Sequence, residues 1–240
     1  MANPDASVHS EFVHDVFSHI AKRYDVMNSV LSFYQHKLWR RFAMKHMKVQ
    51  LGAQCLDVAT GTGDWAIALA QAAGTTGNVV GLDFCQEMLD VAAPKLTRAG
   101  LDGRTELIYG NAMALPFEED RFDYASIGFG LRNVPDILQV LREMTRVVKP
   151  GGMVVSLELS KPTWKPFRAL YYFYFYHMLP FIGKLAVGRS EPYRWLPESL
   201  IPFPDRFKLA ALFQEAGLVN VRHFALTGGI CALHIGIKPQ

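Results

Sequence analysis

Residues Leu56 to Gly63 read Leu-Asp-Val-Ala-Thr-Gly-Thr-Gly, and this stretch decides the fold class of the chain. An apolar strand enters a glycine-rich turn, and a helix is expected to open at Asp64. Such a turn lets backbone N–H groups approach a ligand closely and aims a helix amino terminus at its negative group. A second apolar strand ends at Asp83, about twenty residues further on, where a carboxylate can reach a pair of ribose hydroxyls. We therefore expect a nucleoside cofactor.

Two cofactor classes use this arrangement, dinucleotides and S-adenosylmethionine. A pyrophosphate site normally has Gly-x-Gly-x-x-Gly, whereas the third glycine position here is Ala66. Asp64 at the helix mouth would repel a diphosphate, and it suits S-adenosylmethionine, which carries an ammonium, a sulfonium and a single carboxylate. Gly61 and Gly63 alone would indicate only a tight turn, but Asp83 reverses that preference. We expect S-adenosylmethionine.

Composition and charge narrow the class of protein. The chain has 240 residues, of which half are hydrophobic and a fifth charged, with a net charge of +3. This is typical of one globular domain, and no basic run interleaved with aromatic residues indicates a nucleic-acid partner. Acidic residues near the start, such as Asp5 and Glu11, argue against a signal peptide. Cys55, Cys85 and Cys231 lack metal-ligand spacing, so we expect a reduced, cytoplasmic protein without a metal.

The alternation of short apolar runs with helical patterns predicts an α/β fold with a doubly wound, mostly parallel sheet. We expect one antiparallel strand at the edge of this sheet. The predicted helices cover residues 12–20, 34–47 and 205–216. A further helix is predicted with Pro135 in its first turn and with its end at Lys149-Pro150-Gly151-Gly152. The predicted strands are residues 55–59, 79–83, 106–110, 124–128, 153–159, 220–226 and 230–237. The whole chain, 1–240, is expected to form one domain with an N-terminal helical cap at 1–48.

An aromatic-rich insertion, residues 161–204, separates the fifth and sixth predicted strands. Its apolar run from Tyr171 is too short, and too interrupted by Pro180 and Gly183, to cross a bilayer. A buried core helix is one interpretation. A surface for an apolar ligand or a membrane interface is the other, and both hold if the helix lines a substrate tunnel.

Three further blocks carry a more specific pattern. Tyr-Asp-x-Met-Asn begins at Tyr24 and is followed by His36 and Trp39, Gly-Leu-Arg-Asn begins at Gly130, and Arg-Val-Val-Lys-Pro-Gly-Gly begins at Arg146. Together these blocks resemble the signatures of the UbiE-type quinone C-methyltransferases, and the resemblance covers nearly the whole chain. It implies a class I S-adenosylmethionine-dependent methyltransferase fold with a seven-stranded sheet, N-terminal helices and a helical insertion before the last two strands.

One position separates branches of that family. Members that serve both the ubiquinone and the menaquinone pathway have a serine two residues before the Gly of Gly-Leu-Arg-Asn, and this chain has Gly128 there. The resulting Gly-Phe-Gly form resembles the menaquinone-only enzymes of Gram-positive bacteria. The resemblance therefore implies C-methylation of a prenylated demethylnaphthoquinol. A ubiquinone-pathway benzoquinol, a nicotinamide oxidoreductase and a non-catalytic quinone carrier are the alternatives.

The resemblance also implies a set of cofactor contacts around the predicted turn and strand ends. Asn111 has a second interpretation, as a simple turn residue after the third strand. Gly128 stands where other members of the family have a serine, so it can offer only its backbone to the cofactor. The predicted cofactor-binding residues are Asp57, Gly61, Thr62, Gly63, Asp83, Asn111, Ala112 and Gly128.

Methyl transfer to a ring carbon requires the reduced quinol, because loss of a phenolic proton makes the carbon nucleophilic. The candidates for moving that proton or holding the phenolate are Tyr24, Asp25, His36, Arg132 and Asn133. Arg132 is the strongest of them. The structural alternatives are an Arg132 ion pair with Asp136, a helix cap at Asn133, a core position for Tyr24 and a structural His36.

The isoprenoid tail of such a substrate needs an apolar groove. Its predicted contacts are Phe173, Tyr174, Met178 and Phe181 in the aromatic insertion. A peripheral encounter with the inner face of the cell membrane and a homodimer are further expectations.

Overall fold

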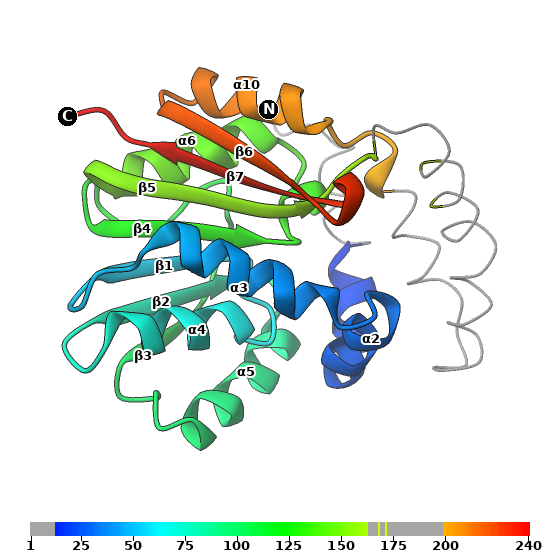
Figure 1. Cartoon of the computed structure of the whole chain (residues 1–240). Coiled ribbons are helices and arrows are strands. Elements are labelled where there is room, and N and C mark those ends of the chain that lie inside the picture. Colours follow the sequence, from blue (N-terminus) through cyan, green and yellow to red (C-terminus); the bar gives the residue numbers. More distant parts are fainter. Residues whose placement is uncertain (1–12, 163–167, 169–170, 172–198) are drawn as a thin grey trace, which may run out of the picture.

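A seven-stranded sheet forms the centre of the computed structural model, which describes residues 13–162, 168, 171 and 199–240. The strand order is β3-β2-β1-β4-β5-β7-β6, and neighbouring strands are parallel except in the two pairs that include β7 (Figure 1). The strands are β1 (Gln54–Val58), β2 (Asn78–Asp83), β3 (Thr105–Tyr109), β4 (Phe122–Gly128), β5 (Val148–Leu159), β6 (Val219–Leu226) and β7 (Cys231–Ile237). The predicted doubly wound α/β sheet is confirmed.

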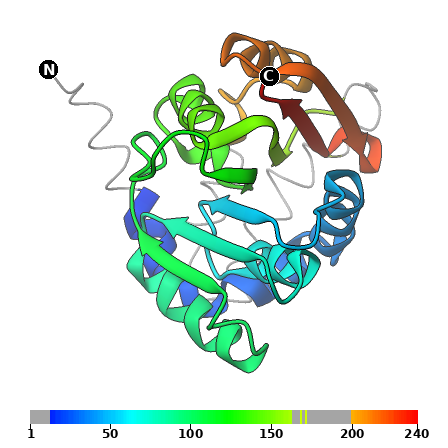
Figure 2. The same cartoon turned by 90° about the vertical axis from the view of Figure 1, so that its left-hand side faces the viewer.

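Helices cover both faces of the sheet (Figure 2). Helices α3, α4 and α5 pack on one face, where Trp39, Trp65 and Leu96 join one buried cluster, and α6 and α10 pack on the other. Residues 13–20 are also helical. The helices are η1 (Ala21–Arg23), α2 (Tyr24–Leu31), α3 (Gln35–Met47), α4 (Asp64–Ala73), α5 (Gln86–Arg98), η2 (Leu131–Asn133), α6 (Ile137–Val147), α10 (Arg206–Glu215) and η4 (Thr227–Gly229).

The sequence predicted the antiparallel strand at the edge of the sheet, and this prediction is wrong. The antiparallel strand is β7, which lies between β5 and β6, and β6 is the edge strand. The three-residue η4 joins β6 to β7, and such a short connection allows only antiparallel pairing. Six of the seven β7 residues are buried, whereas the β6 residues are all exposed or partly buried, so β7 takes the inner place.

Helix α6 begins two residues later than predicted. The Asp136 carboxylate accepts a hydrogen bond from Gln139 N at 3.0 Å and caps the helix, so Pro135 precedes the cap instead of occupying the first turn. The run Lys149-Pro150-Gly151-Gly152 does follow the end of α6, but it lies within β5. Its glycines exchange backbone hydrogen bonds of 2.9 and 3.0 Å with Lys238, which continues the sheet through this segment.

The N-terminal helices reach the carboxyl-terminal edge of the sheet. Figure 1 shows α2 beside this edge, while α3 crosses the face of the sheet. Tyr24 of α2 packs with Phe17 and Met88 in a small cluster between these helices and α5. The cap therefore covers the end of the sheet where ligands of parallel α/β folds bind.

Candidate functional site

The carboxyl ends of β1, β2, β3 and β4 surround a cavity of about 300 Å³. Its walls are mainly apolar, and the N-terminal helices close one side with Val13, Phe17 and Tyr24. A cavity of this size suits a small molecule bound at the switch point of a doubly wound sheet. Of the predicted cofactor-binding residues, Gly61, Asp83, Asn111, Ala112 and Gly128 line it.

The glycine turn and Asp83 form one hydrogen-bonded unit. Gly61 and Gly63 have φ angles of +55° and +80°, in the left-handed region that favours glycine. Gly61 N donates to Asp83 Oδ2 at 2.7 Å, and Cys85 N donates to Asp83 Oδ1 at 3.0 Å. Burial raises the pKa of Asp83 to about 6. The carboxylate retains lone pairs toward the cavity and can accept hydrogen bonds from ligand hydroxyls.

Asp57 lies behind the turn, outside the cavity lining. Its two carboxylate oxygens accept hydrogen bonds of 2.7 Å from Thr60 Oγ1 and Ser126 Oγ. Burial raises its pKa to about 6 as well. The observed contacts of Asp57 therefore brace the strand end and the start of the turn.

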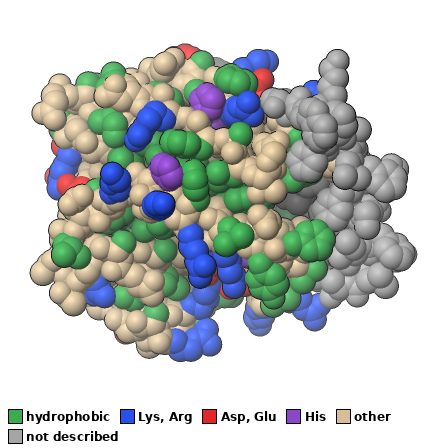
Figure 3. Space-filling model, in the orientation of Figure 1, with side chains coloured by type: hydrophobic (Ala, Val, Ile, Leu, Met, Phe, Trp, Pro, Cys, Tyr) green, Lys and Arg blue, Asp and Glu red, His purple; other side chains and the backbone are tan. Residues whose placement is uncertain are grey.

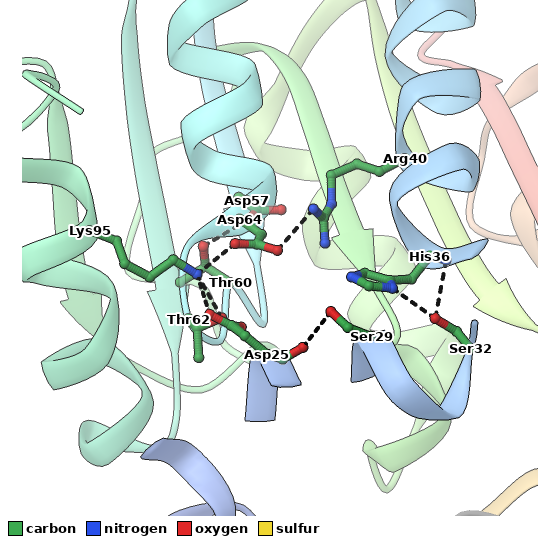
Figure 4. Close-up of polar contacts among 10 residues, drawn as sticks. All are labelled: Asp25, Ser29, Ser32, His36, Arg40, Asp57, Thr60, Thr62, Asp64 and Lys95. Carbon is green, nitrogen blue, oxygen red and sulfur yellow. Dashed lines mark hydrogen bonds and ion pairs between the residues drawn. The ribbon is translucent and has the colours of Figure 1, made fainter. Parts of the chain in front are cut away.

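Thr62 and Asp64 face the N-terminal cap instead of the cavity (Figure 4). Thr62 Oγ1 donates to Asp25 Oδ1 at 2.6 Å, and Lys95 Nζ lies 2.7 Å from Asp25 Oδ2 and 2.5 Å from Asp64 Oδ1. Arg40 Nη1 donates to Asp64 Oδ2 at 3.0 Å. Burial alone would raise the pKa of Asp64, but Arg40 and Lys95 outweigh it and hold the pKa below its usual value.

This pairing corrects one step of the sequence argument. Asp64 was expected to present a negative charge that would repel a diphosphate. Its carboxylate is instead paired with two cations, so Asp64 does not distinguish between the cofactor classes. Asp25 is also occupied on both oxygens, by Thr62 and Lys95, and does not line the cavity.

Arg132 forms a buried ion pair with Glu158, not the predicted alternative pair with Asp136. Arg132 Nη1 donates to Glu158 Oε1 and to Phe129 O, both at 2.6 Å, and Arg132 N donates to Glu158 Oε2 at 3.2 Å. The two side chains are 6% and 1% exposed. Arg132 Nε is buried and has no hydrogen-bond partner among the described residues. Arg132 thus stands behind the cavity wall and retains one unused donor.

Tyr24 and Asn133 are the two catalytic candidates that line the cavity. Burial raises the pKa of Tyr24, although its hydrogen bond with Asn28 and the charge of Arg132 act in the opposite direction. The phenol is therefore protonated at neutral pH and can donate a hydrogen bond. Asn133 Nδ2 donates to Phe129 O at 3.4 Å, and the α6 cap is Asp136, so the alternative of Asn133 as that cap is wrong.

His36 lies outside the cavity lining, at the start of α3. Its Nδ1 is 2.8 Å from Ser32 Oγ (Figure 4). Burial, followed by the charge of Arg40, lowers the pKa of His36 to about 4, so the ring is neutral at physiological pH. These contacts agree with the structural interpretation of this histidine.

Gly128 allows a tryptophan to pack directly against the cavity wall. A Cβ atom at this position would lie 2.6 Å from Trp65 Cε3 and 2.9 Å from Trp65 Cζ3. Trp65 is buried, and its Nε1 donates to Met44 Sδ at 3.2 Å. Serine at this position therefore requires the indole to move. Asn111 is both a turn residue and a wall residue, because its Oδ1 accepts from Met113 N at 2.9 Å.

Among the described residues, one trio brings possible metal ligands together. His14, Cys85 and Glu87 each offer an atom within 4.8 Å of the others. Burial raises the pKa of Cys85 to about 12, and its thiol donates to Glu87 Oε2 at 3.3 Å. Glu87 is exposed, and exposed acidic groups are common without a bound metal, so this trio by itself does not assign a metal centre.

Sequence reasoning missed Lys95, Glu158 and Trp65 as organisers of this site. Glu158 had a weak signal, since it follows the Lys-Pro-Gly-Gly block that carried the family resemblance. Lys95 had none, because it looks like any cation near a helix end. The predicted tail contacts Phe173, Tyr174, Met178 and Phe181 lie outside the described residues.

Comparisons with known proteins agree over nearly the whole chain. The model of the ubiE/COQ5 methyltransferase family matches residues 5–238. The chain is 53% identical over 227 residues to a demethylmenaquinone methyltransferase of Shouchella clausii, covering 95% of this chain and 96% of that protein. It is 55% identical over 226 residues to a protein of the same name from Bacillus subtilis, covering 94% and 97%.

Solved structures with low sequence identity share the fold. An S-adenosylmethionine-dependent methyltransferase from Aquifex aeolicus superposes with a TM-score of 0.61 at 20% identity, over 82% of this chain and 88% of that one. The [4+2]-cyclase SpnF superposes with a TM-score of 0.63 at 19% identity, over 85% and 81%. Because these neighbours differ in their activities, the shared fold alone does not define a reaction.

Proposed function

The chain belongs to the ubiE/COQ5 methyltransferase family, and from this premise we propose that it transfers the methyl group of S-adenosylmethionine to a ring carbon of demethylmenaquinol. The names of its relatives, at 53–55% identity over almost the full length, support this substrate. The structural observation that carries the proposal is the buried Asp83 carboxylate, held by Gly61 N at the carboxyl edge of the sheet and facing the cavity.

The residues at the cavity fit S-adenosylmethionine. Asp83 provides carboxylate acceptors for the ribose hydroxyls. Gly61 beside it has no side chain, so a ligand can approach the backbone there. Asn111 and Ala112 lie further along the same wall, where we assign them to the adenine end. Gly128 and the apolar residues around it complete the wall without adding a charge. Thr62 and Gly63 lie in the turn and Asp57 lies behind it, and we assign all three a supporting role because none of them lines the cavity.

S-adenosylmethionine supplies a methyl group that its sulfonium has already activated. The protein then has to hold the quinol carbon in line with that methyl group, exclude water and stabilise the phenolate. Tyr24 Oη is a protonated donor that can hydrogen-bond a quinol oxygen, and Asn133 can orient the same group. The Arg132 guanidinium stays behind the cavity wall in its pair with Glu158, and its charge acts on the site only through Tyr24, whose pKa it lowers.

The test is methyl transfer from labelled S-adenosylmethionine to a prenylated demethylnaphthoquinol, with and without a reductant that keeps the quinol reduced. We expect label on the ring carbon only when the reductant is present. Tyr24→Phe should lower kcat while leaving S-adenosylmethionine affinity within about threefold, since it removes only the donor hydroxyl. Binding of S-adenosylmethionine without any labelling of the quinol would refute the proposed substrate.

We also propose that the substrate's tail is delivered from a bilayer surface. None of the described helices is long and apolar enough to cross a membrane. The corner between α2 and α3 nevertheless exposes apolar side chains, and α3 contains no acidic residue. Lys and Arg side chains gather beside hydrophobic ones on this face (Figure 3). The exposed apolar residues are Val26, Val30, Phe33, Tyr34 and Leu38, and the exposed cations beside them on α3 are Lys37 and Arg41.

Apolar side chains next to cations favour an interface with acidic lipids. Co-sedimentation with vesicles that contain acidic lipids tests this contact, and Leu38→Glu should weaken it. Equal sedimentation with purely zwitterionic vesicles would contradict it. The predicted homodimer stays a prediction.

A further inference from the structure

We infer that Lys95 is a positioning residue, which fastens α2 to the glycine turn and so fixes two walls of the cavity. The role in catalysis rests on the function proposed above, whereas the fastening itself does not. Lys95 is in the last turn of α5 and does not line the cavity. It acts through the residues that it binds.

The ammonium of Lys95 has three acceptors, one for each of its protons. They are Asp25 Oδ2 at 2.7 Å, Asp64 Oδ1 at 2.5 Å and Thr62 Oγ1 at 3.3 Å. Figure 4 shows the ammonium pointing between the three side chains. The Lys95 side chain is only 17% exposed, and Asp25 and Asp64 are 42% and 29% exposed. Partial burial makes these pairs stronger than ordinary surface ion pairs.

The three acceptors come from two parts of the chain that must meet at the cavity. Asp25 follows Tyr24, whose ring lines the cavity from α2, and Thr62 follows Gly61, whose N–H binds Asp83. Thr62 Oγ1 also donates to Asp25 directly, at 2.6 Å. One ammonium thus holds the residues that follow Tyr24 and Gly61, and both Tyr24 and Gly61 line the cavity.

Removing this cation leaves an unbalanced group of charges. Asp64 retains its pair with Arg40, but Asp25 loses its only ion pair among the described residues, and no cation remains between the two carboxylates. Both carboxylates lie against the same ammonium, at 2.7 and 2.5 Å, so without it the two negative charges repel and α2 is expected to move away from the turn. Movement of α2 carries Tyr24 with it, which opens the side of the cavity that the cap closes.

The experiment compares Lys95→Met with a matched control, Lys238→Met. Lys238 pairs with Asp120 at 2.6 Å, and the two side chains are 19% and 49% exposed, close to the values for Lys95 and Asp25. Asp120 precedes β4 and Lys238 follows β7, so this pair lies at the opposite edge of the sheet from the cavity. Lys95→Arg tests rescue by another cation.

Two readouts distinguish positioning from general stability. The first is amide hydrogen exchange over residues 24–31 in the full chain without ligand, which should become faster in Lys95→Met and remain unchanged in Lys238→Met. The second is the dissociation constant for S-adenosylhomocysteine, measured by calorimetry. We expect it to rise about tenfold in Lys95→Met, to stay within about threefold in Lys95→Arg, and to be unchanged in Lys238→Met.

A double variant sharpens the test. Asp25→Asn added to Lys95→Met removes the unbalanced charge while keeping an acceptor for Thr62, so binding should recover at least threefold. Unchanged exchange over residues 24–31 in Lys95→Met overturns the fastening. Changed exchange with wild-type binding of S-adenosylhomocysteine overturns the positioning role. If the wild type itself fails to bind S-adenosylhomocysteine, the proposed function fails, and the exchange data still decide the fastening.

Discussion

Replacing Glu158 with glutamine should destabilise the protein severely, although the two side chains have nearly the same shape. Glu158 Oε1 accepts from Arg132 Nη1 at 2.6 Å and from Leu159 N at 2.8 Å, and Oε2 accepts from Arg132 N at 3.2 Å. Glutamine has one acceptor oxygen, so its amide group must face one of these N–H donors. It also leaves a guanidinium that is 6% exposed without a counter-charge.

The expected cost follows from burial. Breaking one partner of a buried ion pair costs about 3–5 kcal/mol. For a domain of this size that corresponds to a fall in Tm on the order of 10 °C. Arg132→Met should cost a similar amount, because it leaves Glu158 as an unpaired carboxylate. The double variant should cost clearly less than the sum of the two single changes.

Urea unfolding monitored by circular dichroism measures all three variants and gives the coupling energy. Lys149→Met is a suitable control, since it breaks the more exposed pair with Asp123 at 2.7 Å, far from the cavity, and should cost less than about 1 kcal/mol. If Glu158→Gln costs no more than this control, or if the two single changes add without coupling, the pair does not hold the Gly-Leu-Arg-Asn turn as described.

Three further changes test other parts of the site. Gly128→Ala places a Cβ 2.6 Å from Trp65 and should cost about 1–3 kcal/mol in urea unfolding, whereas an unchanged midpoint would mean that the indole moves freely. The pKa of Asp83 is raised to about 6, and we propose that its ionised form binds ribose, so S-adenosylhomocysteine affinity should fall as pH drops through this value. Asp83→Asn should bind weakly at every pH, and retained pH dependence in calorimetry would exclude Asp83 as the cause. Asp136→Ala removes the cap bond to Gln139 N and should lower the free energy of unfolding by about 1 kcal/mol. Asp136→Asn keeps an acceptor oxygen and should be nearly neutral, so equal losses of stability in both variants would argue against capping.

The strands could be predicted because local sequence controls them. Buried parallel strands are short apolar runs bounded by turns, and the predicted runs at 55–59 and 79–83 agree with β1 and β2 within one residue. The order of the last two strands could not be predicted in this way. It depends on which strand buries both faces, a property of the assembled sheet. Pro135 was misplaced because proline is common both in the first turn and just before a cap.

The sequence predicted where the candidate residues lie in the fold, but not the directions of their side chains. Gly61, Asp83 and Asn111 follow strand ends, and the ends of neighbouring parallel strands meet, so their place at the cavity could be read from the sequence. Thr62 was predicted to contact the cofactor, yet its hydroxyl bonds to Asp25, 37 positions away. Lys95 also bonds to Asp25, which is 70 positions away. Contacts of this kind depend on helix packing, and spacing in the chain does not reveal them.

The inner place of β7 affects how the chain can assemble. β7 comes last of the seven strands during synthesis, yet β6 is attached to the rest of the sheet only through it. The exposed edge of β5 must therefore wait for β7, and until then a long apolar strand is open to pairing with other chains. We expect deletions within residues 231–237 to cause aggregation during expression, and not merely fraying of the sheet edge.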